Sequence, residues 1–151
     1  MQPFRFHSIY QPRIWGGQSM RTMLGRELPD RETAYGEAWE ISDRPEAMSI
    51  VKDGEWEGMP LHRLWEEHRQ EIFGPGYERF PRFPLLCKIL DARENLSVQV
   101  HPPERTAAAR QGEVKNEIWY VLHASPAALI YGGMEETATL PDIRQAAETG
   151  Q

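Results

Sequence analysis

The sequence predicts an all-β protein with added helices, and three observations lead to this class. Residues 96–101 alternate strictly between apolar and polar side chains, as a strand does when its two faces differ. Several short apolar runs end at turns rich in Gly, Pro or Asp. The clearest helical spacing occurs over residues 60–73. The expected strands are residues 35–42, 47–51, 85–91, 96–101, 115–122 and 127–131.

The length and charge of the chain limit the possible classes of function. A chain of 151 residues is one domain or part of a larger one. Its formal net charge of -6 argues against nucleic acid and anionic membranes as partners, because both attract basic surfaces. The N-terminus lacks the apolar core of a signal peptide, and no run approaches the ~18 apolar residues of a membrane helix. These features predict a cytoplasmic protein.

Residues 1–20 are expected to form an irregular arm with short extended pieces. Pro3, Pro12 and the pair Gly16–Gly17 all oppose a helix there. Trp15, directly before the glycine pair, either packs as an aromatic plug beside a turn or contributes to a site. The sequence alone leaves both roles open.

The next elements are a strand pair and a helix. Residues 35–42 and 47–51 are joined by a turn, and Glu40 and Ser42 are expected on a solvated face. The helix is expected to begin at Pro60, which suits a first helical turn, and to end at the glycines that follow residue 73. Its buried stripe is expected to contain Leu61, Leu64, Trp65, His68 and Ile72.

Two residues of chemical interest lie in the apolar run 85–91. Cys87 is the only cysteine, so no internal disulfide is possible, which suits the cytosol. Within this run it is expected to be a core residue and not a nucleophile. Lys88 is costly to bury unless it is paired or functional. An ion pair, a side chain that reaches solvent and a role in a site all remain open.

The stretch 96–102 is the one around which the chain is organised. Leu96, Val98 and Val100 are expected to pack on the body of the protein, while Ser97, Gln99 and His101 share the opposite face. Neighbours on one face lie about 6.5–7 Å apart, so Gln99 and His101 can both reach one ion at about 2.0–2.2 Å. Pro102 ends the strand because it has no N–H to donate.

Three further elements complete the chain. A short helix is expected to start at residues 103–104 and to stop at Gly112. In the strand 115–122, alternation places Lys115, Glu117 and Trp119 on one face. A last helix is expected to begin at a Thr139 cap and to stop at Gly150. Its expected buried side consists of Ile143, Ala146 and Ala147.

Gln99, His101 and Glu117 are therefore candidate metal ligands. An imidazole with oxygen donors suits zinc or another borderline divalent ion. One anionic and two neutral ligands leave the ion with net positive charge, which makes it a good Lewis acid. A satisfied polar cluster without metal is the alternative. No fourth protein ligand is evident, because His123 lies beyond the polar face and His7 is remote in sequence.

Several segments closely resemble the type I mannose-6-phosphate isomerases, in the short bacterial form. They occur in the family's order and cover nearly the whole chain. The segments are Trp15-Gly16-Gly17 and residues 36–42, 83–92, 96–102 and 115–120. The resemblance implies a cupin-like jelly-roll β-barrel with added helices. It also implies one zinc ion held by Gln99, His101 and Glu117, and a substrate pocket lined by Trp15, Ser97, Lys88 and Lys115.

The reaction implied by this resemblance interconverts mannose 6-phosphate and fructose 6-phosphate. A proton would move between C1 and C2 through an enediol-like intermediate, while zinc polarises the carbonyl. Lys88 and Lys115 are the catalytic candidates, since they can hold phosphate or the enediolate. Lys115 can also serve as the base, because a nearby cation disfavours the charged form of a lysine. The residues leave the identity of the base open.

Members of the family continue well beyond residue 151, and their fourth ligand histidine and an active-site arginine lie in that later part. The chain is therefore expected to be the N-terminal portion of a single cupin-type catalytic domain spanning residues 1–151. A barrel without its closing strands has uncovered edges, which recruit other chains, so self-association and lack of activity alone are expected. A non-catalytic cupin that binds metal or sugar, and a folding unit without metal, are the two alternatives.

Overall fold

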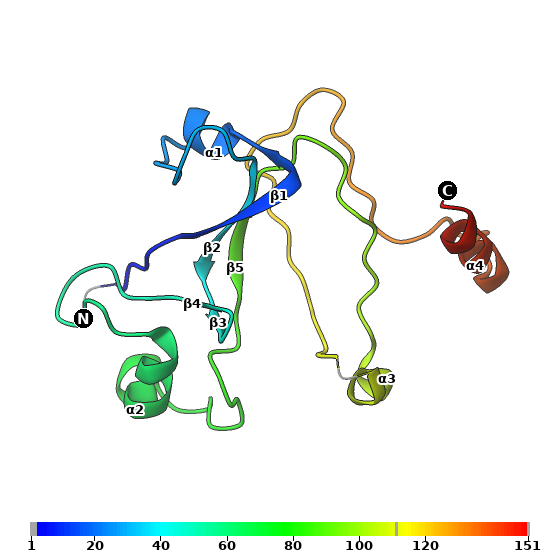
Figure 1. Cartoon of the computed structure of the whole chain (residues 1–151). Coiled ribbons are helices and arrows are strands. Elements are labelled where there is room, and N and C mark those ends of the chain that lie inside the picture. The colour runs from blue at the N-terminus through cyan, green and yellow to red at the C-terminus, as the bar shows by residue number, and fades with distance from the viewer. Residues whose placement is uncertain (1–2, 111, 151) are drawn as a thin grey trace. The chain divides into compact units, whose positions relative to one another are not determined.

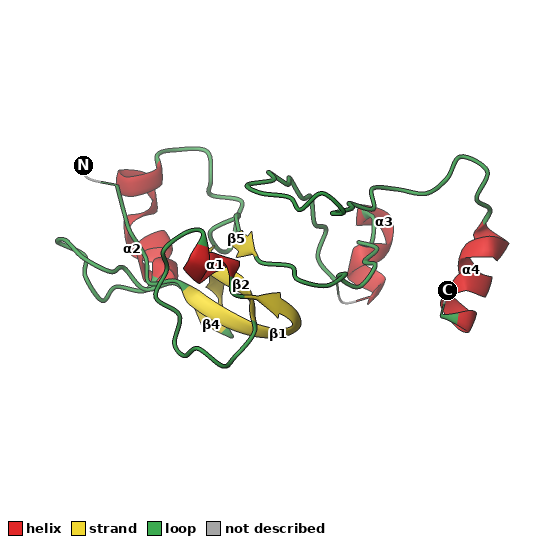
Figure 2. Cartoon of the chain, turned by 90° about the horizontal axis from the view of Figure 1, so that it is seen from above, coloured by secondary structure: helices red, strands yellow, loops and turns green. Residues whose placement is uncertain are grey.

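The computed structural model describes residues 3–110 and 112–150, and its elements divide into two compact units, Met1–Leu96 and Ser97–Gln151 (Figures 1 and 2). Each unit is described by itself. The first unit contains the β-sheet and the longest helix, and the second contains short helices joined by extended segments.

The first unit is built on a three-stranded antiparallel sheet in the order β1-β2-β5. The strands are β1 (Ile9–Gly17), β2 (Tyr35–Ile41) and β5 (Cys87–Leu90). Their pairing sets Trp39 opposite both Ile9 and Lys88. The register of β1 shifts on either side of Pro12, where the backbone has no N–H for the ladder. A separate two-stranded ribbon pairs β3 (Asp43–Arg44) with β4 (Ala47–Met48).

One face of the sheet carries a small core, and the main helix carries a second. Met20 of α1 (Ser19–Thr22) is buried with Tyr35 and Ala38 of β2. Helix α2 (Leu61–Phe73) buries Leu61, Leu64 and Trp65, which lie at helical spacing. The Trp65 ring contacts the rings of Phe73, Tyr77 and Phe83 at centroid distances of 5.1, 6.0 and 5.6 Å.

The predicted helix over 60–73 is confirmed, with Pro60 at its N-cap and Gly74 at its C-cap. Gly74 adopts a φ of 79°, a left-handed backbone that favours glycine. The strands expected at 35–42 and 85–91 are confirmed as β2 and β5. The strand expected at 47–51 is shorter, because the ribbon strand β4 covers only Ala47–Met48.

Three expectations for the first unit are wrong. The arm is not irregular throughout, because residues 9–17 pair with β2 as a bulged strand. Ser42 does not face solvent: it is fully buried, and its N–H donates to Ser49 Oγ over 2.8 Å. Cys87 is exposed and not part of the core, because it is the first residue of β5 and the described residues leave its side chain open to solvent.

The second unit contains α3 (Glu104–Ala107), η1 (Ala108–Arg110) and α4 (Leu140–Thr149). The predicted start of α4 is confirmed by a capping box between Thr139 and Asp142, and its stop by the left-handed Gly150. The hydrogen bonds from Thr139 lower the pKa of the Asp142 carboxyl. The expected buried side is found only in part, because Ile143 and Ala146 are half-buried, Ala147 is exposed and no described residue of α4 is fully buried.

The strands predicted at 96–101, 115–122 and 127–131 are absent from the described residues, where these segments pair with no strand. Val98 and Val100 are 85% and 86% exposed, and Ile118 is 99% exposed. The expectation that this apolar face packs on the body is therefore wrong for this structure. A strand exists only when a neighbouring segment accepts its hydrogen bonds, and no described segment does so here.

A sheet with added helices agrees with the predicted class. The described strands form no closed barrel, so the jelly-roll barrel stays a prediction. The structure shows two compact units, and the assignment of residues 1–151 to one catalytic domain stays a prediction. None of the helices in the described residues is both long enough and apolar enough to span a membrane.

Gly16 supplies a test of the contact between β1 and β2. A Cβ at this position would lie 2.5 Å from the backbone N of Gly36 and 2.7 Å from the carbonyl carbon of Tyr35. Backbone atoms cannot rotate away, so we expect Gly16→Ala to lower the free energy of unfolding by about 1–3 kcal/mol in urea denaturation. Gly132→Ala is the matched control, since a Cβ there meets nothing within 4 Å. Equal stability of the two variants would contradict this packing.

Candidate functional site

A carboxylate lies between two nitrogen groups in the second unit. Glu117 Oε2 is 3.0 Å from His101 Nε2, and Glu117 Oε1 is 2.7 Å from Lys115 Nζ. These residues come from the two extended segments on either side of α3, which Figure 1 shows running to that helix and away from it. The structure therefore brings together two of the predicted ligands and one predicted catalytic lysine.

Glu117 is held in its ionised form by these neighbours. The hydrogen bond from Lys115 and then that from His101 lower the pKa of Glu117 to about 2. Both bonds favour the carboxylate over the neutral acid, since an ionised acceptor makes the stronger bond. Glu117 is thus an anionic oxygen donor at neutral pH, as a metal ligand must be.

His101 and Glu117 are joined by a direct hydrogen bond, and the distance between them is also close to that between two ligands of one ion. Two donors bound at about 2.0–2.2 Å in a tetrahedral site lie roughly 3–3.5 Å apart, and the His101–Glu117 separation is 3.0 Å. Within residues 3–110 and 112–150, no group of three or more His, Cys, Asp and Glu side chains could hold a metal. The predicted ligand set contains only two residues of those types, because its third member is Gln99.

Ser97 and Gln99 lie in the extended segment before His101, and both are exposed. Nothing in the structure tests their predicted roles in binding substrate and metal. Those roles, and the metal role of the His101–Glu117 pair, stay predictions.

Lys88 belongs to a separate cluster in the first unit. Its Nζ lies 4.4 Å from the centroid of the Trp39 ring and 3.6 Å from Glu37 Oε1. Glu37 is buried, and its Oε2 accepts from Arg13 over 2.7 Å and from Trp39 Nε1 over 2.8 Å. Of the roles left open for Lys88, the structure shows an ion pair, and a role in binding substrate stays a prediction.

Trp15 packs against the backbone of β2. A Cβ added to Gly36 would lie 2.6 Å from Trp15 Cζ3, so the ring fills the space that a side chain would need. The carbonyl of Trp15 also accepts from the N–H of Arg93 over 2.9 Å. This is the packing role expected beside the glycine pair, and contact with substrate stays a prediction.

Sequence reasoning missed Glu37 and Arg13. The signal for Glu37 was available, because strand alternation places it on the same face as Trp39, two residues on. Arg13 had no such signal. Its guanidinium reaches Glu37 only because β1 folds beside β2, 24 residues apart along the chain.

Comparison with known proteins decides the family. The family described as "Phosphomannose isomerase type I, catalytic domain" matches residues 3–126. The chain belongs to this family. It is 42% identical over 151 residues to a mannose-6-phosphate isomerase of Streptococcus mutans, covering 99% of this chain and 46% of that protein. It is 37% identical to the mannose-6-phosphate isomerase ManA of Bacillus subtilis, again covering 99% of this chain and 46% of that protein.

A solved structure gives the same result. The crystal structure of the mannose 6-phosphate isomerase from Bacillus subtilis matches with a TM-score of 0.66 and 37% identity, over 76% of this chain and 35% of that one. The chain therefore spans less than half the length of these relatives. The resemblance expected from the sequence motifs is confirmed.

The Lys88 cluster predicts an order of stabilities. Lys88→Met leaves Glu37 with its bonds from Arg13 and Trp39, so we expect it to lower the free energy of unfolding by less than about 1 kcal/mol. Glu37→Met leaves two cations without their shared carboxylate, so we expect a larger loss. Urea denaturation of both variants measures the order. If Lys88→Met costs as much as Glu37→Met, then Lys88 is mainly a structural partner.

Proposed function

We propose that this chain supplies the N-terminal part of a zinc-dependent mannose-6-phosphate isomerase. The enzyme would interconvert mannose 6-phosphate and fructose 6-phosphate by moving a proton between C1 and C2. The observation that carries the proposal is the contact of Glu117 with both His101 and Lys115, inside the segment that the family description matches. The chain covers 46% of the length of each of these two relatives, so the activity is proposed for the whole enzyme and not for this chain alone.

In this proposal Gln99, His101 and Glu117 hold the metal. The donor types suit zinc, and the 3.0 Å separation of His101 Nε2 and Glu117 Oε2 suits two ligands of one ion. When bound, zinc would supply a Lewis acid that stabilises negative charge on a substrate oxygen. Another divalent metal would fit the same donors.

The two lysines would bind the anionic groups of the substrate. Lys115 Nζ is already oriented by Glu117 Oε1 at 2.7 Å, and Lys88 Nζ by Glu37 and the Trp39 ring. An ammonium held in place loses little freedom when it binds a phosphate or an enediolate oxygen. Ser97 and Trp15 complete the proposed substrate contacts.

The proposal also includes the cupin-like jelly-roll barrel, self-association and a cytoplasmic location. The exposed apolar residues of 96–101 and 115–122 support the first two, because strands with one apolar face need a covering sheet or another chain. A single cysteine and bacterial metabolic enzymes as relatives support the third. A non-catalytic metal- or sugar-binding cupin is the competing function.

Zinc binding tests the metal assignment directly. We expect the chain to bind zinc, and His101→Ala or Glu117→Gln to weaken binding at least tenfold, because the first removes a ligand nitrogen and the second replaces the anionic carboxylate by a neutral amide. His123→Ala is the control, since that histidine lies outside the predicted set. Competition against a chromophoric chelator measures the affinities. Equal zinc affinity in all four proteins would refute the assignment.

A coupled isomerase assay and light scattering test the activity. We expect the zinc-loaded chain to self-associate and to show no turnover. Adding the C-terminal part of the Streptococcus mutans relative should restore some turnover, since that part extends beyond the matched region. Lys88→Met should then reduce turnover in the complemented enzyme much more than it reduces stability. A monomer that turns over alone would show that the chain is complete, and a complemented protein that binds sugar phosphate without turnover would favour the non-catalytic cupin.

A further inference from the structure

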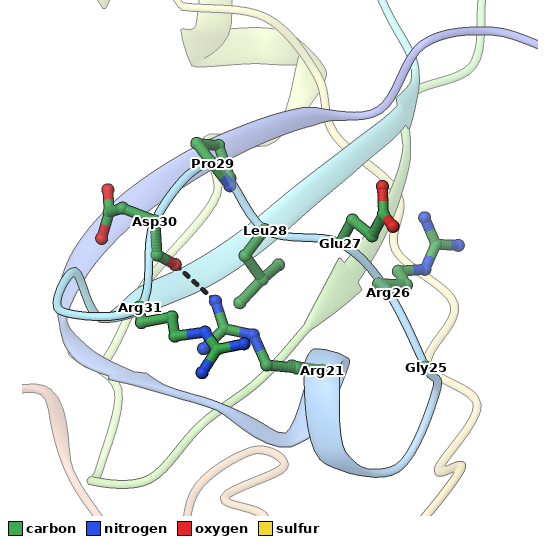
Figure 3. A pocket seen from close by; sticks show the side chains of 8 residues that line it. All are labelled: Arg21, Gly25, Arg26, Glu27, Leu28, Pro29, Asp30 and Arg31. Atoms are coloured by element: carbon green, nitrogen blue, oxygen red, sulfur yellow. Dashed lines mark hydrogen bonds between the residues drawn. The ribbon is translucent and has the colours of Figure 1, made fainter.

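The loop between α1 and β2 forms a pocket that the proposed function does not use. Its lining comes entirely from residues 21–31, and its volume is about 550 Å³ (Figure 3). Three arginines line it, Arg21, Arg26 and Arg31, although the protein as a whole is acidic with a formal net charge of -6. The lining therefore has more basic than acidic side chains, whereas the whole chain has more acidic than basic ones.

The Asp30 carboxylate in the lining is held in its ionised form, but among the described residues it makes no ion pair with the arginines, because its oxygens are hydrogen-bonded to other groups. Asp30 Oδ1 accepts from the N–H of Thr33 over 2.6 Å and from that of Glu32 over 3.0 Å. Asp30 Oδ2 accepts from the hydroxyls of Thr33 and Tyr35 over 2.9 and 2.8 Å. These bonds, that from the Thr33 N–H above all, lower the pKa of Asp30. Figure 3 shows the carboxylate pointing away from Arg21 and Arg31.

The three arginines differ in how their charges are compensated. Arg26 is paired with Glu40 over 2.8 Å. The guanidinium of Arg21 donates to Gln18 Oε1 over 2.8 Å and to the Asp30 carbonyl, and both acceptors are neutral. Arg31 is exposed, and the ion pairs among the described residues include neither Arg21 nor Arg31. Arg21 and Arg31 thus line the pocket together with two carboxylates, the exposed Glu27 and the hydrogen-bonded Asp30, and form an ion pair with neither among the described residues.

The loop that carries these groups is held in place. Gln18 Nε2 donates to the Thr33 carbonyl over 2.9 Å, and the N–H of Arg26 donates to the Met20 carbonyl over 3.1 Å. Leu28, at the base of the pocket, packs against the core residues beside β2. A site with a fixed backbone and an oriented Arg21 spends little of its binding energy on ordering.

We propose that Arg21 and Arg31 form a binding site for a phosphate group, supplied by inorganic phosphate or by a small phosphate monoester. Guanidinium groups match the oxygens of phosphate in paired hydrogen bonds, and Arg21 and Arg31 can make them without first breaking an ion pair, since none of the ion pairs among the described residues includes either. The volume suits a small ligand, and Leu28 and Pro29 offer apolar contact to its organic part. This site is distinct from the His101–Glu117 pair and does not depend on the proposed isomerase activity.

Amide chemical shifts of the full chain, measured without metal, test the proposal. Inorganic phosphate and mannose 6-phosphate are titrated separately, and we expect saturable shifts at Gly25 and Leu28. Arg31→Gln should weaken binding at least fivefold, and it should leave the fold intact because the side chain is exposed. Arg21→Gln should weaken it similarly. Arg63→Gln is the control, because Arg63 lies on α2 and pairs with Glu67 over 2.8 Å.

The outcomes separate the possibilities. Tighter binding of mannose 6-phosphate than of phosphate identifies a monoester site, and equal binding identifies a phosphate site; both support the proposal. It is overturned if the shifts are absent, if both Arg21→Gln and Arg31→Gln bind as the control does, or if the shifts occur only around Lys88 and Lys115. The last result would leave the proposed function standing, so failure of one is distinguishable from failure of the other.

Discussion

The pairing of β2 on both of its edges is the constraint on which the first unit depends. β2 accepts β1 on one side and β5 on the other, so segments from three distant parts of the chain meet at Gly36 and Glu37. The backbones of β1 and β2 can approach each other closely because Gly16 and Gly36 have no side chains at their contact. Beyond β5, the buried Asp91 accepts from the N–H of Met20 over 3.1 Å, which ties α1 to the same sheet.

The two lysines singled out by the sequence occupy similar surroundings in the two units. Lys88 and Arg13 share the carboxylate of Glu37, and Lys115 and His101 share that of Glu117. The two clusters differ in burial: Glu37 is buried, whereas Lys115 and Glu117 are exposed, so the ion pair of Lys88 contributes more to the stability of its unit than that of Lys115 does.

Local signals account for the elements that sequence reasoning placed well. The helix over 61–73 needs only its apolar stripe, a proline at its start and a glycine at its end. The cap of α4 needs only Thr139 and Asp142, three residues apart. The failures are of another kind. Alternation in 96–101 describes which faces a strand would have, but it contains no information about a neighbour to pair with. Ser42 was misplaced for the same reason, since Ser49 satisfies its N–H from across the ribbon.

The sequence by itself determined the family, the chemical types at the candidate site and the helices α2 and α4, because motifs and helical hydrogen bonds lie within a few residues of one another. Only the tertiary structure decided that Glu37 binds Lys88 and Arg13, that Glu117 bonds directly to both Lys115 and His101, and that Arg21 lacks a carboxylate partner. These outcomes depend on which distant segments fold side by side. Ion pairs act over a few ångströms in space, whatever the separation along the chain.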